Sequence, residues 1–167
     1  MEKGDCLILK NNDVYFAIIL HHSTFDDGEL LHGFLVVGDQ YSNTPTLKEI
    51  ESGKILGYKF VDKTSDLMNS LAWISKKHNP SELYNGVKYD VFTIPDALFN
   101  EESNRIQRIG RMNLHEKFFP RPEFHPIVSN YERLIEVISE RISKRDPSKV
   151  EWKRFYDAFK LDEVLKK

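Results

Sequence analysis

Short apolar runs separated by polar clusters dominate the first third of the chain. Residues 6–9 and 14–20 are aliphatic and β-branched, and the polar residues 10–13 between them favour a tight turn, so the pattern predicts a β-hairpin. Residues 14–20 are apolar at every position, which is typical of a central strand covered on both faces. A polar loop at 23–29 and a third strand at 30–37 are expected to follow.

From Thr46 onward the sequence pattern predicts both helices and strands. Thr46 and Glu49 have the spacing of a capping box, so a short helix that ends near Gly53 is expected. Residues 54–61 and 87–94 are typical of strands, the second of which is stopped by Pro95. Apolar residues at helical spacing weakly favour a helix over 66–76, although they also permit a strand.

The C-terminal part has a different periodicity. Ser129 and Glu132 form a second capping-box motif, followed by an apolar stripe at helical spacing that comprises Tyr131, Leu134, Ile135, Ile138 and Ile142. A second helix is predicted from the spacing of Trp152, Phe155, Tyr156 and Phe159. Strands followed by helices predict an α+β fold in a single domain over 1–167, with 1–95 mainly β, 96–128 irregular around one short helix, and 129–167 helical.

Composition narrows the class of protein. The 167 residues are 40% hydrophobic and carry a net charge of −2, which disfavours a protein that binds polyanions over its whole surface. The single cysteine, Cys6, has no partner for an internal disulfide, and no apolar run approaches the roughly 18 residues of a membrane span. We expect a soluble cytoplasmic protein without membrane association or a cofactor.

One cluster has side chains suited to a metal ion. His21 and His22 precede Asp26, Asp27 and Glu29, and imidazole and carboxylate groups bind zinc, iron or manganese. Adjacent residues of a strand point to opposite faces, so His21 and His22 are not expected to share one ion. A solvated acidic loop after a strand is the favoured interpretation, and no metal is predicted.

Arginines recur every third residue at Arg105, Arg108 and Arg111. On a helix they would form one edge able to bind phosphates. Glu101 and Glu102 stand just before them, and no aromatic residues alternate with them as in binders of single strands, so a solvated or ion-paired face is favoured.

Two other features have ordinary interpretations. His115 and His125 flank a segment rich in proline and aromatic residues, which predicts a loop that covers the sheet or holds a pocket. Cys6 lies in an apolar strand, where a thiol is usually a small buried hydrophobe. No phosphate-binding glycine loop or nucleophile elbow occurs, so nothing in the sequence predicts a catalytic residue.

The opening of the chain supplies a family resemblance. Gly4, Asp5, a short strand, a polar turn and the long strand at 14–20 resemble the start of the type twenty-six immunity proteins of bacterial polymorphic toxin systems. The resemblance covers about the first 60 residues, and the same pattern opens many SH3-like barrels. The resemblance implies an α+β fold that begins with an N-terminal antiparallel, SH3-like twisted sheet or partial barrel. It does not cover the chain from Ser129 onward, where the apolar stripes predict that the C-terminal helices pack on this sheet. It also implies cytoplasmic binding of a cognate toxin without catalytic residues.

The acidic excess of the N-terminal part is compatible with binding a toxin. Residues 1–62 contain five basic and ten acidic residues, and an acidic surface suits a basic toxin. We therefore expect a non-catalytic protein-binding module that contacts its partner through Phe25, Asp26, Asp27 and Glu29. The alternatives are a nucleic-acid-binding or RNA-processing barrel that uses the three arginines, and an enzyme around His21 and Asp26.

Overall fold

A computed structural model describes residues 1–60, 82–83, 87–89, 91–114, 127–143, 153–161 and 165. The first strands are β1 (Asp5–Asn11), β2 (Val14–Asp26), β3 (Glu29–Tyr41) and β4 (Lys54–Phe60), with the short helix α1 (Leu47–Glu51) before β4. They are followed by β5 (Glu82–Leu83), β6 (Val87–Tyr89), β7 (Val91–Pro95), α3 (Asp96–Glu101) and β8 (Ile106–Arg111). The last elements are α4 (Tyr131–Ser143) and β9 (Lys153–Lys160).

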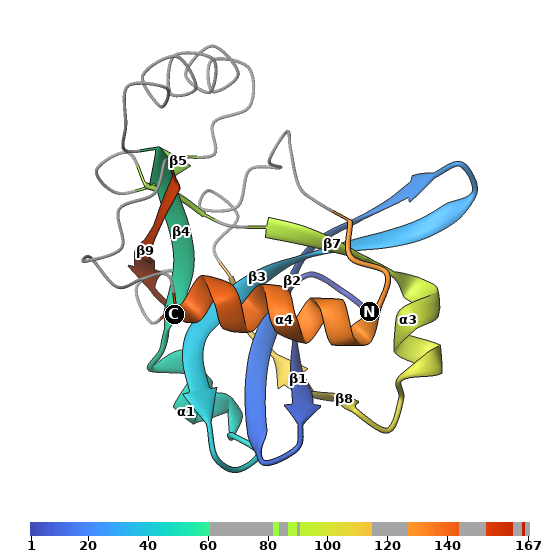
Figure 1. The fold of residues 1–167 in the computed structure, drawn as a ribbon, viewed down its shortest axis with the longest axis horizontal. Helices are drawn as coiled ribbons and strands as arrows, with labels where there is room; N and C mark the ends of the chain where they lie inside the picture. The colour runs from blue at the N-terminus through green and yellow to red at the C-terminus, as the bar shows by residue number, and fades with distance from the viewer. Residues whose placement is uncertain are drawn as a thin grey trace.

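The strands form one antiparallel sheet in the order β5, β6, β4, β3, β2, β1 and β8, while β7 pairs with β3 and β9 pairs with β4 (Figure 1). The predicted α+β class is confirmed. The long strands β2 and β3 lie at the centre, as the wholly apolar residues 14–20 predicted.

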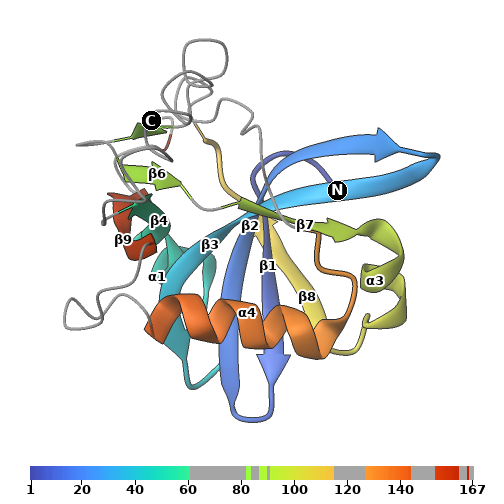
Figure 2. The ribbon, with the colours of Figure 1, turned by 45° about the horizontal axis from the view of Figure 1, so that its top comes forward.

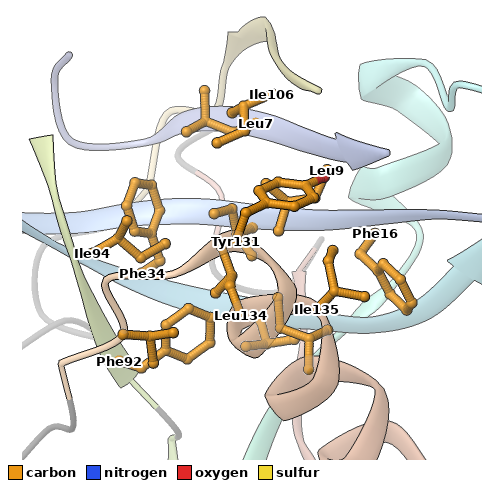
Figure 3. Close-up of a cluster of buried hydrophobic side chains, with 14 of the residues drawn as sticks. Leu7, Leu9, Phe16, Phe34, Phe92, Ile94, Ile106, Tyr131, Leu134 and Ile135 are labelled. Carbon is orange, nitrogen blue, oxygen red and sulfur yellow. The ribbon is translucent and has the colours of Figure 1, made fainter. Parts of the chain in front are cut away.

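Both faces of the sheet are buried. On one face, α4 lies across the sheet (Figure 2), and its residues Tyr131, Leu134 and Ile135 are buried against strand residues such as Phe16 and Phe34 (Figure 3). The alternating residues of the same strands face the other way and pack with Ile50 of α1 and with Met112, Leu114 and Leu161. Because successive side chains of a strand point to opposite faces, the same strands contribute residues to two separate cores, one on each face of the sheet.

Several local predictions hold. The Thr46 capping box is present, because the Thr46 hydroxyl accepts from the Glu49 amide and the Glu49 carboxylate accepts from the Thr46 amide. Cys6 is fully buried. The strand expected at 54–61 is β4, whereas the helix expected at 66–76 lies outside the described residues.

The predicted second C-terminal helix is wrong. Residues 153–160 form β9, which pairs with β4 from Lys54 opposite Lys160 to Phe60 opposite Lys153, so 129–167 is not wholly helical. Aromatic residues favour strands, and pairing with β4 outweighs a helical spacing that spans only two turns. Trp152 lies outside the described residues.

The sequence also misassigned two other segments. The single strand expected at 87–94 is two strands, because β6 pairs with β4 whereas β7 pairs with β3. Residues 96–128 were expected to be irregular around one short helix. They contain α3 and also β8, which pairs with β1.

The N-terminus of α4 differs from the prediction by one residue. The helix begins at Tyr131, and the side-chain oxygen of Asn130, not Ser129, accepts from the Arg133 amide at 3.0 Å. Asparagine at this position satisfies one of the amides that a helix start leaves without a partner.

We predict that Asn130→Ala lowers the free energy of unfolding by about 1 kcal/mol, because it removes the N-cap acceptor. The neighbouring exposed residue gives a matched control, since Ser129→Ala should change stability by less than about 0.5 kcal/mol. Urea unfolding followed by circular dichroism measures both. A larger loss for Ser129→Ala than for Asn130→Ala would contradict the observed cap.

Candidate functional site

The hairpin of β2 and β3 extends beyond the rest of the sheet as a projecting arm, defined here as residues 23–32 (Figures 1 and 2). The neighbouring strand β1 pairs with β2 only as far as Ile19, and β7 pairs with β3 only from Leu31 onward. Among the described strands, the outermost pairs of the hairpin, Phe25 opposite Leu30 and Asp26 opposite Glu29, therefore pair only with each other. An isolated two-stranded ribbon is marginally stable. Because no other described strand pairs with the outer part of this hairpin, a long surface there is available to a partner.

The tip of the arm is a tight turn and not the polar loop expected at 23–29. Asp27 and Gly28 link the strands directly and have φ values of 49° and 77°. Positive φ at both central residues defines the type I′ turn, whose twist matches that of a hairpin. Asp tolerates this conformation and Gly has no side chain to oppose it.

All four residues predicted to bind a partner gather at this tip. Phe25 is 76% exposed, and Asp26, Asp27 and Glu29 are exposed as well. Within the described part of the chain, none of the three carboxylates forms an ion pair or a side-chain hydrogen bond. The tip thus combines a large exposed aromatic ring with three uncompensated negative charges.

A β-bulge lies at the base of the arm. Leu20 is opposite Phe34 and His22 is opposite Gly33, so His21 is an extra residue in β2. An ideal Cβ on Gly33 would stand 2.3 Å from the His22 ring, which places that imidazole directly over the glycine. A side chain at this position would force the His22 ring to move.

The bulge corrects the expectation that His21 and His22 point to opposite faces. Their Nδ1 atoms are 2.8 Å apart, so one imidazole donates to the other and uses the lone pair that a metal would need. Asp26 stands four strand residues away from His22, about 13 Å along β2. Among the described residues no group of three or more metal-ligating side chains gathers, and His115 and His125 lie outside those residues.

Arg108 and Arg111 lie in strand β8 and Arg105 directly before it, not on a helix, and all three side chains are ion-paired, as the sequence favoured. Arg105 binds Glu102 and Glu132 and stacks over the Tyr131 ring, 4.0 Å from its centroid. Arg108 Nη2 and Arg111 Nε each donate to Oδ1 of Asp5 at 2.9 Å.

A bulge explains how residues three apart in a strand reach one carboxylate. Cys6 is opposite Gly110 and Leu7 is opposite Arg108, so Ile109 is an extra residue that brings Arg108 and Arg111 to the same side. Asp5 is 1% exposed, and its other oxygen accepts from the Glu2 amide. Burial raises the pKa of the Asp5 carboxyl, but these hydrogen bonds outweigh it and lower the pKa to about 2.

Sequence reasoning missed a second cluster at the base of the arm. His32 Nδ1 lies 2.7 Å from Ser23 Oγ, and His32 Nε2 lies 2.7 Å from Asp96 Oδ1. Ser23 and His32 are directly opposite in the hairpin, which follows from the Asp27–Gly28 turn because both are equally far from it. Asp96 lies 64 residues beyond His32, and no local pattern in the sequence links the two residues.

Comparison with protein-family models, curated proteins and solved structures gives no match for this chain. None of the helices that the structure describes is long and apolar enough to cross a membrane.

We predict that ionised Asp5 stabilises the fold by up to about 2 kcal/mol at neutral pH. Its pKa of about 2 lies below the ordinary value of 3.8, so this contribution is complete above about pH 4 and is lost as the pH falls toward 2. Urea unfolding between pH 2 and 6 measures the loss. Asp5→Asn should flatten the slope, whereas the exposed control Asp13→Asn should keep it. Equal slopes for Asp5→Asn and the wild type would contradict the assignment.

Proposed function

We propose that this protein is a protein-binding module, and more particularly an immunity protein that neutralises a cognate bacterial toxin by binding it through the projecting arm. The observation that carries the proposal is the tip of the arm, where an aromatic side chain that is 76% exposed stands among three unpaired carboxylates. Exposed aromatic residues serve as binding anchors, because they bury a large area at little cost in side-chain entropy.

The charge of the tip suggests the chemistry of the partner. Carboxylates at the end of a projecting hairpin attract a basic surface, raise the association rate and disfavour acidic partners. Many toxins that cut nucleic acids need a basic groove for their substrate. An arm that enters such a groove would exclude the nucleic acid without any chemistry of its own.

The resemblance of the opening residues to type twenty-six immunity proteins supports the same proposal, which places the protein in the bacterial cytoplasm. The SH3-like character of the sheet also belongs to the proposal. It is supported by the meander of β1, β2 and β3 and by the two bulges in the pairing of β2 with β3, since bulges bend a strand toward barrel curvature.

The nucleic-acid alternative draws less support. Arg105, Arg108 and Arg111 all form ion pairs with carboxylates within the protein, and each such pair would have to be broken or shared before a phosphate could bind. Phosphate binding at these residues stays a prediction.

The immunity role predicts that a toxin domain is encoded beside the gene, and the first test measures association of the protein with that domain. The triple variant Asp26→Asn, Asp27→Asn and Glu29→Gln removes three charges and keeps the turn, since asparagine tolerates positive φ. We expect the protein to bind the toxin domain and to relieve its toxicity on co-expression. The triple variant should associate at least about tenfold more slowly at low salt, with a weaker salt dependence.

The control for this test removes the same number of charges elsewhere, with Asp13→Asn, Asp39→Asn and Glu101→Gln at exposed positions away from the tip. It should retain most of the wild-type association rate. Equal slowing by both variants would show a general charge effect and not a role for the tip. Failure of the wild-type protein to bind or to protect would refute the immunity role.

The second test concerns Phe25. We predict that Phe25→Ala weakens binding of the same toxin domain by tenfold or more, mainly through faster dissociation, because the ring is the apolar anchor. Stability should be unchanged, since the ring contributes little to the core. Thr24→Ala, its neighbour on the opposite face of β2, is the matched control. An unchanged dissociation rate for Phe25→Ala would show that the apolar anchor is not at the tip.

A further inference from the structure

Ser23, His32 and Asp96 form a continuous chain of hydrogen bonds at the base of the arm. Ser23 lies in β2, His32 lies opposite it in β3, and Asp96 is the first residue of α3. Both links measure 2.7 Å. This is the spacing of a nucleophile, a general base and a group that orients the base.

The donor and acceptor of each hydrogen bond follow from the carboxylate of Asp96. A carboxylate only accepts hydrogen bonds, so His32 Nε2 must carry the proton that faces Asp96. In the neutral imidazole, Nδ1 then has a free lone pair and accepts from the Ser23 hydroxyl. The ring is reversed relative to the usual serine triad, where Nε2 faces the serine, but the direction of proton transfer is the same.

Burial divides the cluster into a fixed part and an accessible part. His32 is 2% exposed, and the rings of Phe34 and Phe99 stand against it with centroids 6.4 and 5.7 Å away. The imidazole is therefore held in one orientation. Ser23 is exposed, and the Asp96 side chain is 42% exposed, so solvent and small molecules reach the nucleophile.

We propose that Ser23 is an activated nucleophile and that the cluster hydrolyses esters. Ser23 Oγ attacks the acyl carbon while its proton passes to His32 Nδ1, and the ester C–O bond breaks as that proton goes to the departing alcohol. Water then attacks the acyl-serine and gives a proton to Nδ1, which returns it to Ser23 Oγ as the carboxylic acid leaves. Asp96 positions the imidazole and stabilises its cationic form.

The surroundings define the class of substrate. Phe25 is two residues from Ser23 in β2, so the two side chains share one face about 7 Å apart. Leu30 stands opposite Phe25 on that face and adds apolar surface. The carboxylates of the tip lie just beyond and repel anions. We therefore expect neutral or cationic esters with apolar acyl groups. This activity goes beyond toxin binding and does not depend on it.

The test treats the 167-residue protein with p-nitrophenyl butyrate and, separately, with a fluorophosphonate probe, which loses fluoride when a serine attacks it. Release of nitrophenol, intact mass and peptide mapping are the measurements. We expect one adduct, located on Ser23, and steady release of nitrophenol. A wild-type protein without an adduct, or with one at another residue, would overturn the proposal.

Variants separate chemistry from structure. Ser23→Ala should abolish labelling, and the exposed control Ser42→Ala should not change its rate. Asp96→Asn should slow labelling by tenfold or more, because general-base assistance contributes about 10²- to 10⁴-fold. An equal rate in Asp96→Asn, with unfolding unchanged, would refute the role of His32 as a base.

The outcome is independent of the binding experiments. Labelling is measured without any toxin, and the triple variant Asp13→Asn, Asp39→Asn and Glu101→Gln, whose changes lie outside both the tip and the cluster, should be labelled by the fluorophosphonate at a rate close to that of the wild type. Loss of labelling in this variant would show that the adduct depends on overall charge and not on the cluster, and would overturn the assignment.

Discussion

The pairing of β2 with β3 is the interaction on which the rest of the structure depends. These two strands of 13 residues each connect the β1 and β8 side of the sheet to the β4, β6 and β9 side, and they supply side chains to both cores. Their register places apolar residues on both faces at the centre and polar residues at the end. A slip of one residue would exchange the two faces, so that the side chains of each core would have to fit the other.

The same register positions both candidate sites. The type I′ turn at Asp27–Gly28 sets Phe25 opposite Leu30 and Ser23 opposite His32, while the bulge at His21 turns the two histidines toward each other. The two ends of the arm are thus stabilised by different interactions. Its base is held by packing and by the hydrogen bond of His32 to Asp96 of α3, whereas among the described strands its tip pairs only within the hairpin itself.

Sequence reasoning succeeded where local patterns decide the structure and failed where distant segments decide it. Residues 14–20 were predicted as a central strand because no position is polar. Residues 153–160 became β9 because β4 pairs with them, a condition that their own spacing does not encode. Arg108 and Arg111 meet on Asp5 only because of a bulge. The acidic residues beside Phe25 are visible as a local run in the sequence, and their role in binding stays a prediction. The contact of His32 with Ser23 depends on the register of the hairpin, and its contact with Asp96 depends on the folded chain.

The unsupported end of the arm has a further consequence for association between copies of the chain. In the described structure, β2 and β3 beyond His22 and before Leu31 leave backbone amides and carbonyls open along both outer edges. Open strand edges are templates for edge-to-edge pairing, and charged side chains are a common protection against it. Two arms that approached each other would bring six carboxylates together, three from each tip. The acidic tip therefore keeps identical arms apart, and the edges stay available to a partner of opposite charge.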